Sequence, residues 1–444
     1  MEKSVGLISL GCAKNLVDSE IMLGFVERAG FRIVVDPEAA DVLVVNTCGF
    51  IGPAKEESIS TILEMAELKK KGRCRALVVT GCLSGRYKEE LLASIPEIDG
   101  LLGTTEMNQI GEVVDLILAG ERVIRTGSAF DYDDPDMPRV LASGSHMAYL
   151  KIAEGCGHQC AFCVIPQIRG TYRSRRPEAV LREAEALVAQ GIKELVVIAQ
   201  DTTGYGKDLG GISLAGLLKE IAQLPVPWIR VLYTYPSSID DSYIETVAEY
   251  ENVLPYIDLP LQHASDSVLR RMLRPGSYST QLQLIKRLRS SIPQAFLRSS
   301  FIVGFPGETQ SEFEDLKAFL GEAQLQHAGI FKFSPEEDTR AFAMTGQVDN
   351  ELKERRYEEA MQIQKDISLL HNNRLVGQTL QVLVDGPAAE SDLVVCGRHR
   401  GQAPEVDGVV YLGRPDLRQG DMVSAIIKEA HPYDLVGEVE EGTH

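Results

Sequence analysis

The sequence lacks a long apolar run at its N-terminus. After Glu2 and Lys3, the apolar residues extend only to Leu10 and stop at Gly11. This run is too short for a secretion signal and far too short for a membrane span, which takes about 20 apolar residues. We therefore expect a cytoplasmic protein that makes no use of a membrane.

Positive charge is also scarce, because 45 Lys and Arg residues stand against 64 Asp and Glu residues and give a formal net charge of −19. A protein that coats nucleic acid needs an excess of cationic side chains to neutralise phosphates, so this balance argues against that class. The same balance is compatible with a basic protein partner. A local basic groove remains open.

Cysteine is sparse as well, with 8 residues in a chain of 444. In the absence of a secretion signal we do not expect a disulfide framework, because the cytoplasm keeps thiols reduced. Metal ligation or catalysis explains these cysteines better. The chain is longer than one hydrophobic core usually serves, so two or three domains are expected.

Residues 1–125 alternate short apolar runs with amphipathic stretches, and the apolar runs cover residues 5–10, 42–45 and 76–80. This βαβ rhythm predicts a parallel sheet covered by helices. We assign residues 126–141 to a linker. The reason is that residues 131–138 are acidic and interrupted by proline, a composition that seldom packs into a core.

Residues 142–372 repeat the alternation with more units. The strand candidates are residues 148–152, 195–199, 229–233, 256–260, 301–303 and 329–333, and the amphipathic stretches include 178–190, 281–290 and 312–322. This pattern predicts a six-unit (β/α) partial barrel with its functional residues at the C-terminal ends of the strands. Residues 373–440 instead carry short strands broken by glycine, at 378–384, 406–412 and 422–427, which predict a small antiparallel barrel.

Three closely spaced cysteines follow the first strand of the partial barrel, as Cys156-x-x-x-Cys160-x-x-Cys163. Iron–sulfur clusters take thiolate ligands, normally four per cluster, so three cysteines leave one iron open to a substrate or cofactor. A zinc site completed by His158 is the alternative. Zinc sites more often use paired C-x-x-C motifs, and the spacing after a strand favours a cluster.

A second set of cysteines ends the three N-terminal strands, because Cys12, Cys48 and Cys82 each follow an apolar run. The carboxyl ends of parallel strands meet at one edge of a sheet, so these side chains are expected to converge and to hold a second cluster. The alternative is that each is an inert core residue. Cys74 precedes its strand and Cys396 lies alone in the C-terminal segment, so both are interpreted as structural.

The C-x3-C-x2-C motif on a partial barrel, the three-cysteine N-terminal segment and the small C-terminal barrel together resemble the methylthiotransferases, a family of radical S-adenosylmethionine (SAM) enzymes. Residues 301–308 (FIVGFPGE) look like the family's strand and loop. The resemblance covers nearly the whole chain. It implies an α/β multidomain fold, with an N-terminal parallel α/β domain, a central radical SAM core built as a partial (β/α)6 barrel, and a C-terminal TRAM domain.

The resemblance also implies the cofactors, which are two 4Fe-4S clusters and SAM. The Cys156, Cys160 and Cys163 set would bind the radical-generating cluster, whose open iron chelates SAM. The Cys12, Cys48 and Cys82 set would bind an auxiliary cluster that holds the sulfur to be methylated. One SAM would supply the methyl group and a second a 5'-deoxyadenosyl radical.

The family implies either of two substrates, an adenosine in transfer RNA or an aspartate in a ribosomal protein. Residues 9–20 (SLGCAKNLVDSE), 260–266 (PLQHASD) and 402–408 (QAPEVDG) are similar to the ribosomal-protein branch. That branch inserts a methylthio group at the β-carbon of an aspartate in small-subunit ribosomal protein S-twelve. Transfer RNA is the alternative substrate.

The charge of the C-terminal segment bears on the same choice. From residue 375 to residue 444 there are 5 Lys and Arg against 12 Asp and Glu, a net of −7. Such a surface repels a polyanion and attracts a lysine-rich protein. Acidity that merely keeps the domain soluble is the alternative explanation.

Residues that contact SAM are harder to assign. Many superfamily members carry a Gly-Gly-Glu stretch after the second strand, whereas residues 198–203 here read IAQDTT. Gln200, Gln262 and Ser300 lie at or near expected strand C-terminal ends and are candidates for SAM contacts. Alternatively, each of them caps a helix or bonds the backbone.

A basic run follows the cluster loop and consists of Arg169, Arg173, Arg175 and Arg176. These side chains are expected either to meet an acidic substrate loop or the cofactor carboxylate, or to form a solvated approach to a helix. Family behaviour implies a reduced flavodoxin-like protein as the electron donor. A non-catalytic ribosome-binding factor is the alternative from a different class, and the open coordination position left by three cysteines argues against it.

Overall fold

The computed structural model describes residues 3–127, 130–389 and 391–440. The chain divides into two compact units. The first unit comprises Met1–Ser143, Ala153–Arg182 and Ser334–Phe342, and the second comprises Gly144–Ile152, Glu183–Phe333 and Ala343–His444. Within the described ranges, no helix is long and apolar enough to cross a membrane.

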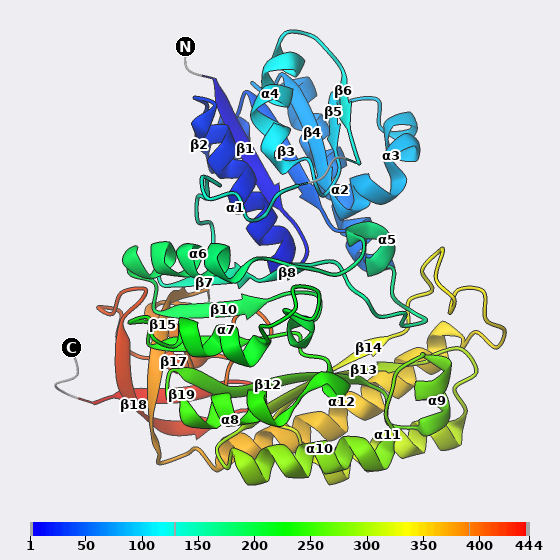
Figure 1. Ribbon diagram of the computed structural model, residues 1–444, viewed down its shortest axis with the longest axis vertical. Helices are drawn as coiled ribbons and strands as arrows, with labels where there is room; N and C mark the ends of the chain where they lie inside the picture. Colours follow the sequence, from blue (N-terminus) through cyan, green and yellow to red (C-terminus); the bar gives the residue numbers. More distant parts are fainter. Residues whose placement is uncertain (1–2, 128–129, 390, 441–444) are drawn as a thin grey trace. The chain divides into compact units, whose positions relative to one another are not determined.

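The first unit contains a parallel sheet of six strands in the order β2-β1-β3-β4-β5-β6 (Figure 1), which confirms the parallel sheet predicted for residues 1–125. The strands are β1 (Ser4–Ser9), β2 (Arg32–Val34), β3 (Val42–Thr47), β4 (Ala76–Gly81), β5 (Gly100–Leu102) and β6 (Val123–Arg125). The helices are α1 (Ala13–Arg28), α2 (Gly52–Lys71), α3 (Cys82–Ser94) and α4 (Ile110–Leu118), with short 3-10 turns η1 (Pro37–Ala39) and η2 (Met107–Gln109).

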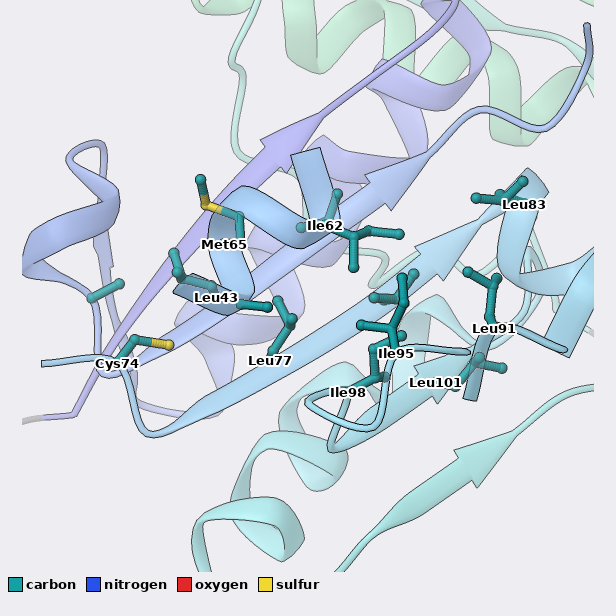
Figure 2. Packing of buried hydrophobic residues seen from close by; sticks show 14 residues of the cluster. Leu43, Ile62, Met65, Cys74, Leu77, Leu83, Leu91, Ile95, Ile98 and Leu101 are labelled. Atoms are coloured by element: carbon teal, nitrogen blue, oxygen red, sulfur yellow. The ribbon is translucent and has the colours of Figure 1, made fainter. Parts of the chain in front are cut away.

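Helices cover both faces of this sheet, which is why β3 and β4 read as continuous apolar runs and are buried along their whole length. Leu43 and Val45 of β3 pack into one core with residues of α2 and α3, and Cys74 lies in the same core (Figure 2). Asn46 points to the opposite face, where its side chain donates to Ser19 of α1 at 2.8 Å. Because β1, β3 and β4 are parallel neighbours in the sheet, their C-terminal ends lie at one edge.

The first unit also contains β8 (Ala153–Glu154), α5 (Ile165–Arg169) and β9 (Arg173–Ser174), and β8 pairs antiparallel with β9. Tyr132, from the acidic segment, is buried, and its hydroxyl donates to the Glu154 carboxylate at 3.1 Å. The expectation that residues 131–138 do not pack is therefore wrong for Tyr132. An aromatic ring with a polar tip can be buried in an acidic segment when the tip finds an acceptor.

The second unit contains six parallel strands in the order β14-β13-β12-β11-β10-β7, as the six-unit partial barrel required (Figure 1). The strands are β7 (Met147–Lys151), β10 (Glu194–Ile198), β11 (Trp228–Val231), β12 (Val253–Gln262), β13 (Phe296–Val303) and β14 (His327–Lys332). The helices are α6 (Pro177–Ala189), which begins in the first unit, α7 (Leu214–Ile221), α8 (Asp241–Glu249), α9 (Asp266–Arg271), α10 (Tyr278–Ser291), α11 (Gln310–Ala323) and α12 (Asn350–Asn373), with 3-10 turns η3 (Thr202–Gly204) and η4 (Pro236–Ser238).

The C-terminal barrel closes in the order β15-β16-β17-β19-β18. Its strands are β15 (Thr379–Ala388), β16 (Ser391–His399), β17 (Val410–Leu412), β18 (Met422–Ala430) and β19 (Leu435–Val439). Four of its pairings are antiparallel, and only β17 with β19 is parallel. The strand predicted over residues 406–412 is wrong over residues 406–409, which are a loop.

This loop overlaps a segment, residues 399–407, that packs at the N-terminal ends of the partial-barrel strands. The Tyr256 hydroxyl donates to the Asp407 carboxylate at 2.6 Å, and Arg298 lies 3.5 Å from the same carboxylate. His327 approaches the Gly401 carbonyl at 2.8 Å, and a side chain at Gly401 would collide with the ring of Phe296. Residues 402–408, quoted above for their likeness to the ribosomal-protein branch, thus include a structural joint of the second unit.

Candidate functional site

Cys12, Cys48 and Cys82 lie at the C-terminal edge of the sheet in the first unit. Cys12 follows β1 and is the N-cap of α1, Cys48 follows β3 directly, and Cys82 is the first residue of α3 after β4. These three strands are neighbours in the sheet. Parallel strands deliver their C-terminal residues to one edge, so the structure brings this predicted set together.

Two glycines allow the backbone to approach closely at this edge. Gly11 has a φ of +87°, and a Cβ placed there would lie 2.7 Å from the Cys48 Cβ and 3.0 Å from its Sγ. Gly81 has a φ of +98°, and a Cβ placed there would lie 2.5 Å from the carbonyl oxygen and 2.8 Å from the nitrogen of Thr47. Only glycine meets both the left-handed conformation and the close approach.

The three thiols differ in their electrostatic environment. Removal from water raises the pKa of Cys48 to about 11, and the charges of Cys82 and Cys12 act in the same direction. Burial also raises the pKa of Cys82, against the opposing charge of Arg169. At Cys12 desolvation is outweighed by Lys14, Arg169 and backbone N–H groups, so the pKa of Cys12 is lowered. Such mutual effects require the thiols to be close neighbours.

Arg169, the last residue of α5, is buried beside this edge. One end of its guanidinium (Nη2) donates to the Cys82 Sγ at 3.4 Å and to the Asn15 side-chain oxygen at 3.1 Å. The other (Nη1) donates to Asp18 at 2.5 Å and to Glu154 at 3.3 Å. Desolvation is outweighed by the charges of Cys82, Asp18 and Glu154, which raise the pKa of Arg169 far above its usual range, so the cation is permanent.

The Cys156, Cys160 and Cys163 set lies on one loop of the same unit, and all three side chains are half-buried. The Cys156 N–H donates to the Gly170 carbonyl at 3.2 Å and closes the base of this loop. Within the loop, the Cys163 N–H donates to the Cys160 carbonyl at 3.1 Å. The eight cysteines, all among the described residues, form no disulfide.

Both cysteine sets have the donor chemistry of an iron–sulfur cluster, because thiolates are the ligands that clusters take. Among the described residues, no group of three or more His, Cys, Asp and Glu side chains is arranged to hold one metal ion. His158 presents its backbone N–H to the Cys156 Sγ at 3.5 Å. The assignment of the two sets to clusters rather than to a zinc ion stays a prediction.

The three SAM candidates all belong to the second unit. Gln200 lies two residues beyond β10, and Gln262 is the last residue of β12. Ser300 lies in the middle of β13, on its half-buried face, and Gln262 is in register with the next residue, Phe301. Gln262 has a φ of +74°, a conformation that costs a non-glycine residue free energy and occurs often at functional sites. Their assignment to SAM remains a prediction.

The basic run does not act as one group. Arg169 is neither solvated nor available to a substrate loop, so both expectations are wrong for this residue, whose charge is taken by Asp18 and Glu154. Arg175 is buried too. Arg173 and Arg176 are exposed, and Arg176 pairs with Asp133 at 3.5 Å, as expected for a solvated approach to α6.

Sequence reasoning missed the polar residues of α1 that surround the cysteines. Asn15 donates to the Leu10 carbonyl at 2.7 Å, and Asp18 binds Arg169. Both are at most 3% exposed. The signal was present, since both residues lie within residues 9–20, quoted above for their likeness to the ribosomal-protein branch, but their partner Arg169 lies far along the chain.

Comparisons with known proteins agree with this organisation. Residues 4–103 match the model described as uncharacterized protein family UPF0004, residues 150–320 match the radical SAM superfamily, and residues 376–439 match the TRAM domain. In fold, the chain is similar to the radical SAM methyltransferase TsrM from Kitasatospora setae (TM-score 0.58, 16% identity, 77% of this chain and 74% of that chain). It is also similar to the cobalamin-dependent radical enzyme OxsB (TM-score 0.52, 12% identity, 82% and 56%).

The fold, the C-x3-C-x2-C loop and the superfamily match define a radical SAM enzyme. Two relatives, each named ribosomal protein uS12 methylthiotransferase RimO, extend this over the whole chain. The protein of Pelotomaculum thermopropionicum is 48% identical over 98% of both chains, and that of Symbiobacterium thermophilum is 49% identical over 98% of this chain and 91% of its own. The chain belongs to the RimO family of radical SAM methylthiotransferases, whose cofactors are SAM and 4Fe-4S clusters.

Proposed function

We propose that this enzyme inserts a methylthio group at the β-carbon of an aspartate in ribosomal protein uS12, the small-subunit protein S-twelve. Its relatives at 45–49% identity are named for uS12. The structural observation that carries the proposal is the convergence of Cys12, Cys48 and Cys82 in the same compact unit as the C-x3-C-x2-C loop. A methylthio transfer needs a radical source and a separate sulfur site, and two cysteine sets supply both.

Each cysteine set has its own task in this proposal. Cys156, Cys160 and Cys163 hold the cluster that binds SAM, and SAM bound there supplies a 5'-deoxyadenosyl radical able to remove hydrogen from a C–H bond. Cys12, Cys48 and Cys82 hold the auxiliary cluster. Gln200, Gln262 and Ser300 orient SAM from the C-terminal half of the partial barrel.

The charge of the C-terminal barrel supports a protein substrate over transfer RNA. Of its five cationic side chains, Arg398 is buried between Glu194 and Asp385. Arg414 and Lys428 are paired with Asp416 and Glu438. RNA binding requires cationic side chains that neutralise phosphates, and few such side chains of the barrel are left for this role.

The test uses purified enzyme, reconstituted anaerobically with iron, sulfide, SAM and a reductant, and offered uS12 and transfer RNA in parallel. We expect mass spectrometry to find the methylthio group on one aspartate of uS12 and none on the RNA. A uS12 variant with asparagine at that position is the control and should stay unmodified. Methylthiolated RNA beside unmodified uS12 would contradict the proposal.

Three further expectations belong to the same proposal. A reduced flavodoxin-like protein donates the electron, and the enzyme works in the cytoplasm, where ribosomal proteins are made. The chain is organised as a methylthiotransferase domain (1–125), a linker (126–141), a radical SAM core (142–372) and a TRAM domain (373–440). The electron donor is testable by replacing the chemical reductant with purified flavodoxin and its reductase.

A further inference from the structure

Arg169 is tied to more partners than a structural ion pair needs. Asp18 and Glu154 already provide two carboxylates for one guanidinium, at 2.5 and 3.3 Å. A buried arginine is stable when such acceptors satisfy it. The Nη2 nitrogen nevertheless points away from the carboxylates, to the Asn15 oxygen and the Cys82 Sγ at 3.1 and 3.4 Å.

Asn15 fixes the direction of this contact. Its amide nitrogen donates to the Leu10 carbonyl at 2.7 Å, so its oxygen faces the guanidinium. The Asn46 side chain in turn donates to the Asn15 carbonyl at 2.9 Å. The guanidinium is therefore held from three sides, and its orientation toward the Cys82 sulfur is fixed by buried groups.

The backbone next to Arg169 holds the other cysteine set. Gly170 accepts the N–H of Cys156 at 3.2 Å, and Glu154, a partner of the Arg169 side chain, is paired with Arg173 across the β8–β9 ladder. Arg169, which contacts Cys82, thus directly precedes Gly170, whose carbonyl closes the base of the loop that carries Cys156, Cys160 and Cys163.

We infer that Arg169 is a positioning residue of the N-terminal cluster, which hydrogen-bonds the Cys82 ligand, raises the reduction potential of that cluster and ties it to the loop of the second cysteine set. The inference rests on the proposed role of Cys82 as a cluster ligand. Its physical basis is general, because hydrogen bonds to cluster sulfurs and nearby positive charge both stabilise the reduced, more negative state.

The test isolates the N-terminal cluster in the full-length chain by replacing Cys156, Cys160 and Cys163 with alanine. In this parent, reductive titration followed by electron paramagnetic resonance gives the midpoint potential of the remaining cluster. We expect Arg169→Gln to lower the midpoint potential and to change the resonance signal. Arg169→Lys keeps the charge but loses the forked geometry, so it should give an intermediate value.

The matched control is Arg73→Gln, which removes the same charge from the same unit. Arg73 pairs with Asp41, at the opposite end of the strands, with Nε–Oδ1 at 2.9 Å. The midpoint potential of the cluster in the Arg73→Gln protein should equal that of the parent. If the Arg169→Gln protein does not bind iron, the Arg169→Lys protein provides the test instead. A midpoint potential of its cluster below that of the parent supports the inference.

Two results overturn the inference and can be told apart. In the first result, the parent binds iron and its cluster has the same midpoint potential as the cluster in the Arg169 variants. This result rejects the role of Arg169 and leaves the proposed function intact. A parent that binds no iron rejects the cluster at Cys12, Cys48 and Cys82, and with it both the proposed function and the role of Arg169.

Discussion

Arg398 of the C-terminal barrel donates a hydrogen bond of 2.6 Å to Glu194, the first residue of β10, and both side chains are buried. Glu194 also accepts from Arg230 at 2.6 Å, and Arg398 reaches Asp385 at 2.8 Å. Barrel and core of the second unit are thus joined by alternating charges. Because these groups have left water, each depends on its partners.

Replacing Arg398 with methionine is expected to destabilise the protein by about 3–5 kcal/mol, the usual cost of removing one partner of a buried ion pair. Thermal or urea unfolding of the full chain measures this loss. The matched control is Arg414→Met, which breaks the exposed pair with Asp416 and should cost about 0–1 kcal/mol. Equal stability of the two variants would show that the buried network adds nothing.

His399 gives the second unit a dependence on pH. Burial, together with the charges of His327 and Arg230, lowers the pKa of His399 to about 3, while Asp407 opposes the shift. Below about pH 6.5 this side chain therefore binds a proton in the unfolded chain but not in the folded chain. Its contribution to stability is present at neutral pH and is lost as the pH falls. Between pH 6.5 and 5 this amounts to about 2 kcal/mol.

The variant His399→Gln tests this dependence, since its side-chain oxygen can still accept the Gly401 N–H that His399 accepts at 3.0 Å. Unfolding of both proteins is measured at pH 7.5 and pH 5. The native protein should lose more stability than the variant over this range. Parallel losses would assign the pH dependence to other groups.

Gly11→Ala is expected to remove the N-terminal cluster selectively. The added methyl group would meet Cys48 at 2.7 Å in a left-handed backbone, so the edge must open. Iron content should fall from about eight to about four per chain, the number held by one cluster. Gly30→Ala is the matched control, because Gly30 has a φ of +83° but open space around it, and its iron content should not change.

Replacing Cys12, Cys48 and Cys82 together with alanine should separate the two chemistries. We expect the variant to retain formation of 5'-deoxyadenosine from SAM and to lose methylthiolation, because only the radical cluster remains. Chromatography of the nucleoside and mass spectrometry of uS12 measure the two activities. Cys74→Ala, in the core of Figure 2, is the control and should keep both. Loss of 5'-deoxyadenosine in the triple variant would contradict separate roles.

The sequence was sufficient where local pattern decides the structure. The continuous apolar runs of β3 and β4 predicted strands buried on both faces, and the rule that parallel strands end at one edge predicted the convergence of Cys12, Cys48 and Cys82. Neither prediction required knowledge of tertiary contacts.

It was insufficient where a residue takes its role from a distant partner. Arg169 looked like part of a basic surface run, and only the fold brings Asp18 to it across 151 positions of sequence. Residues 406–409 read as a strand, yet the Asp407 carboxylate is held by Tyr256, also 151 positions away, which keeps the segment in a loop. Periodicity carries no information on such pairings.

The segment 399–407 has a consequence for engineering. A chimera that received a C-terminal barrel without counterparts of Asp407 and Arg398 would leave Tyr256 and Arg298 without their carboxylate partner, and Glu194 without its second guanidinium. Buried charges without partners are costly, so grafting the barrel alone should fail. The C-terminal barrel of this unit should therefore be exchanged only together with the partial-barrel strand residues that contact it.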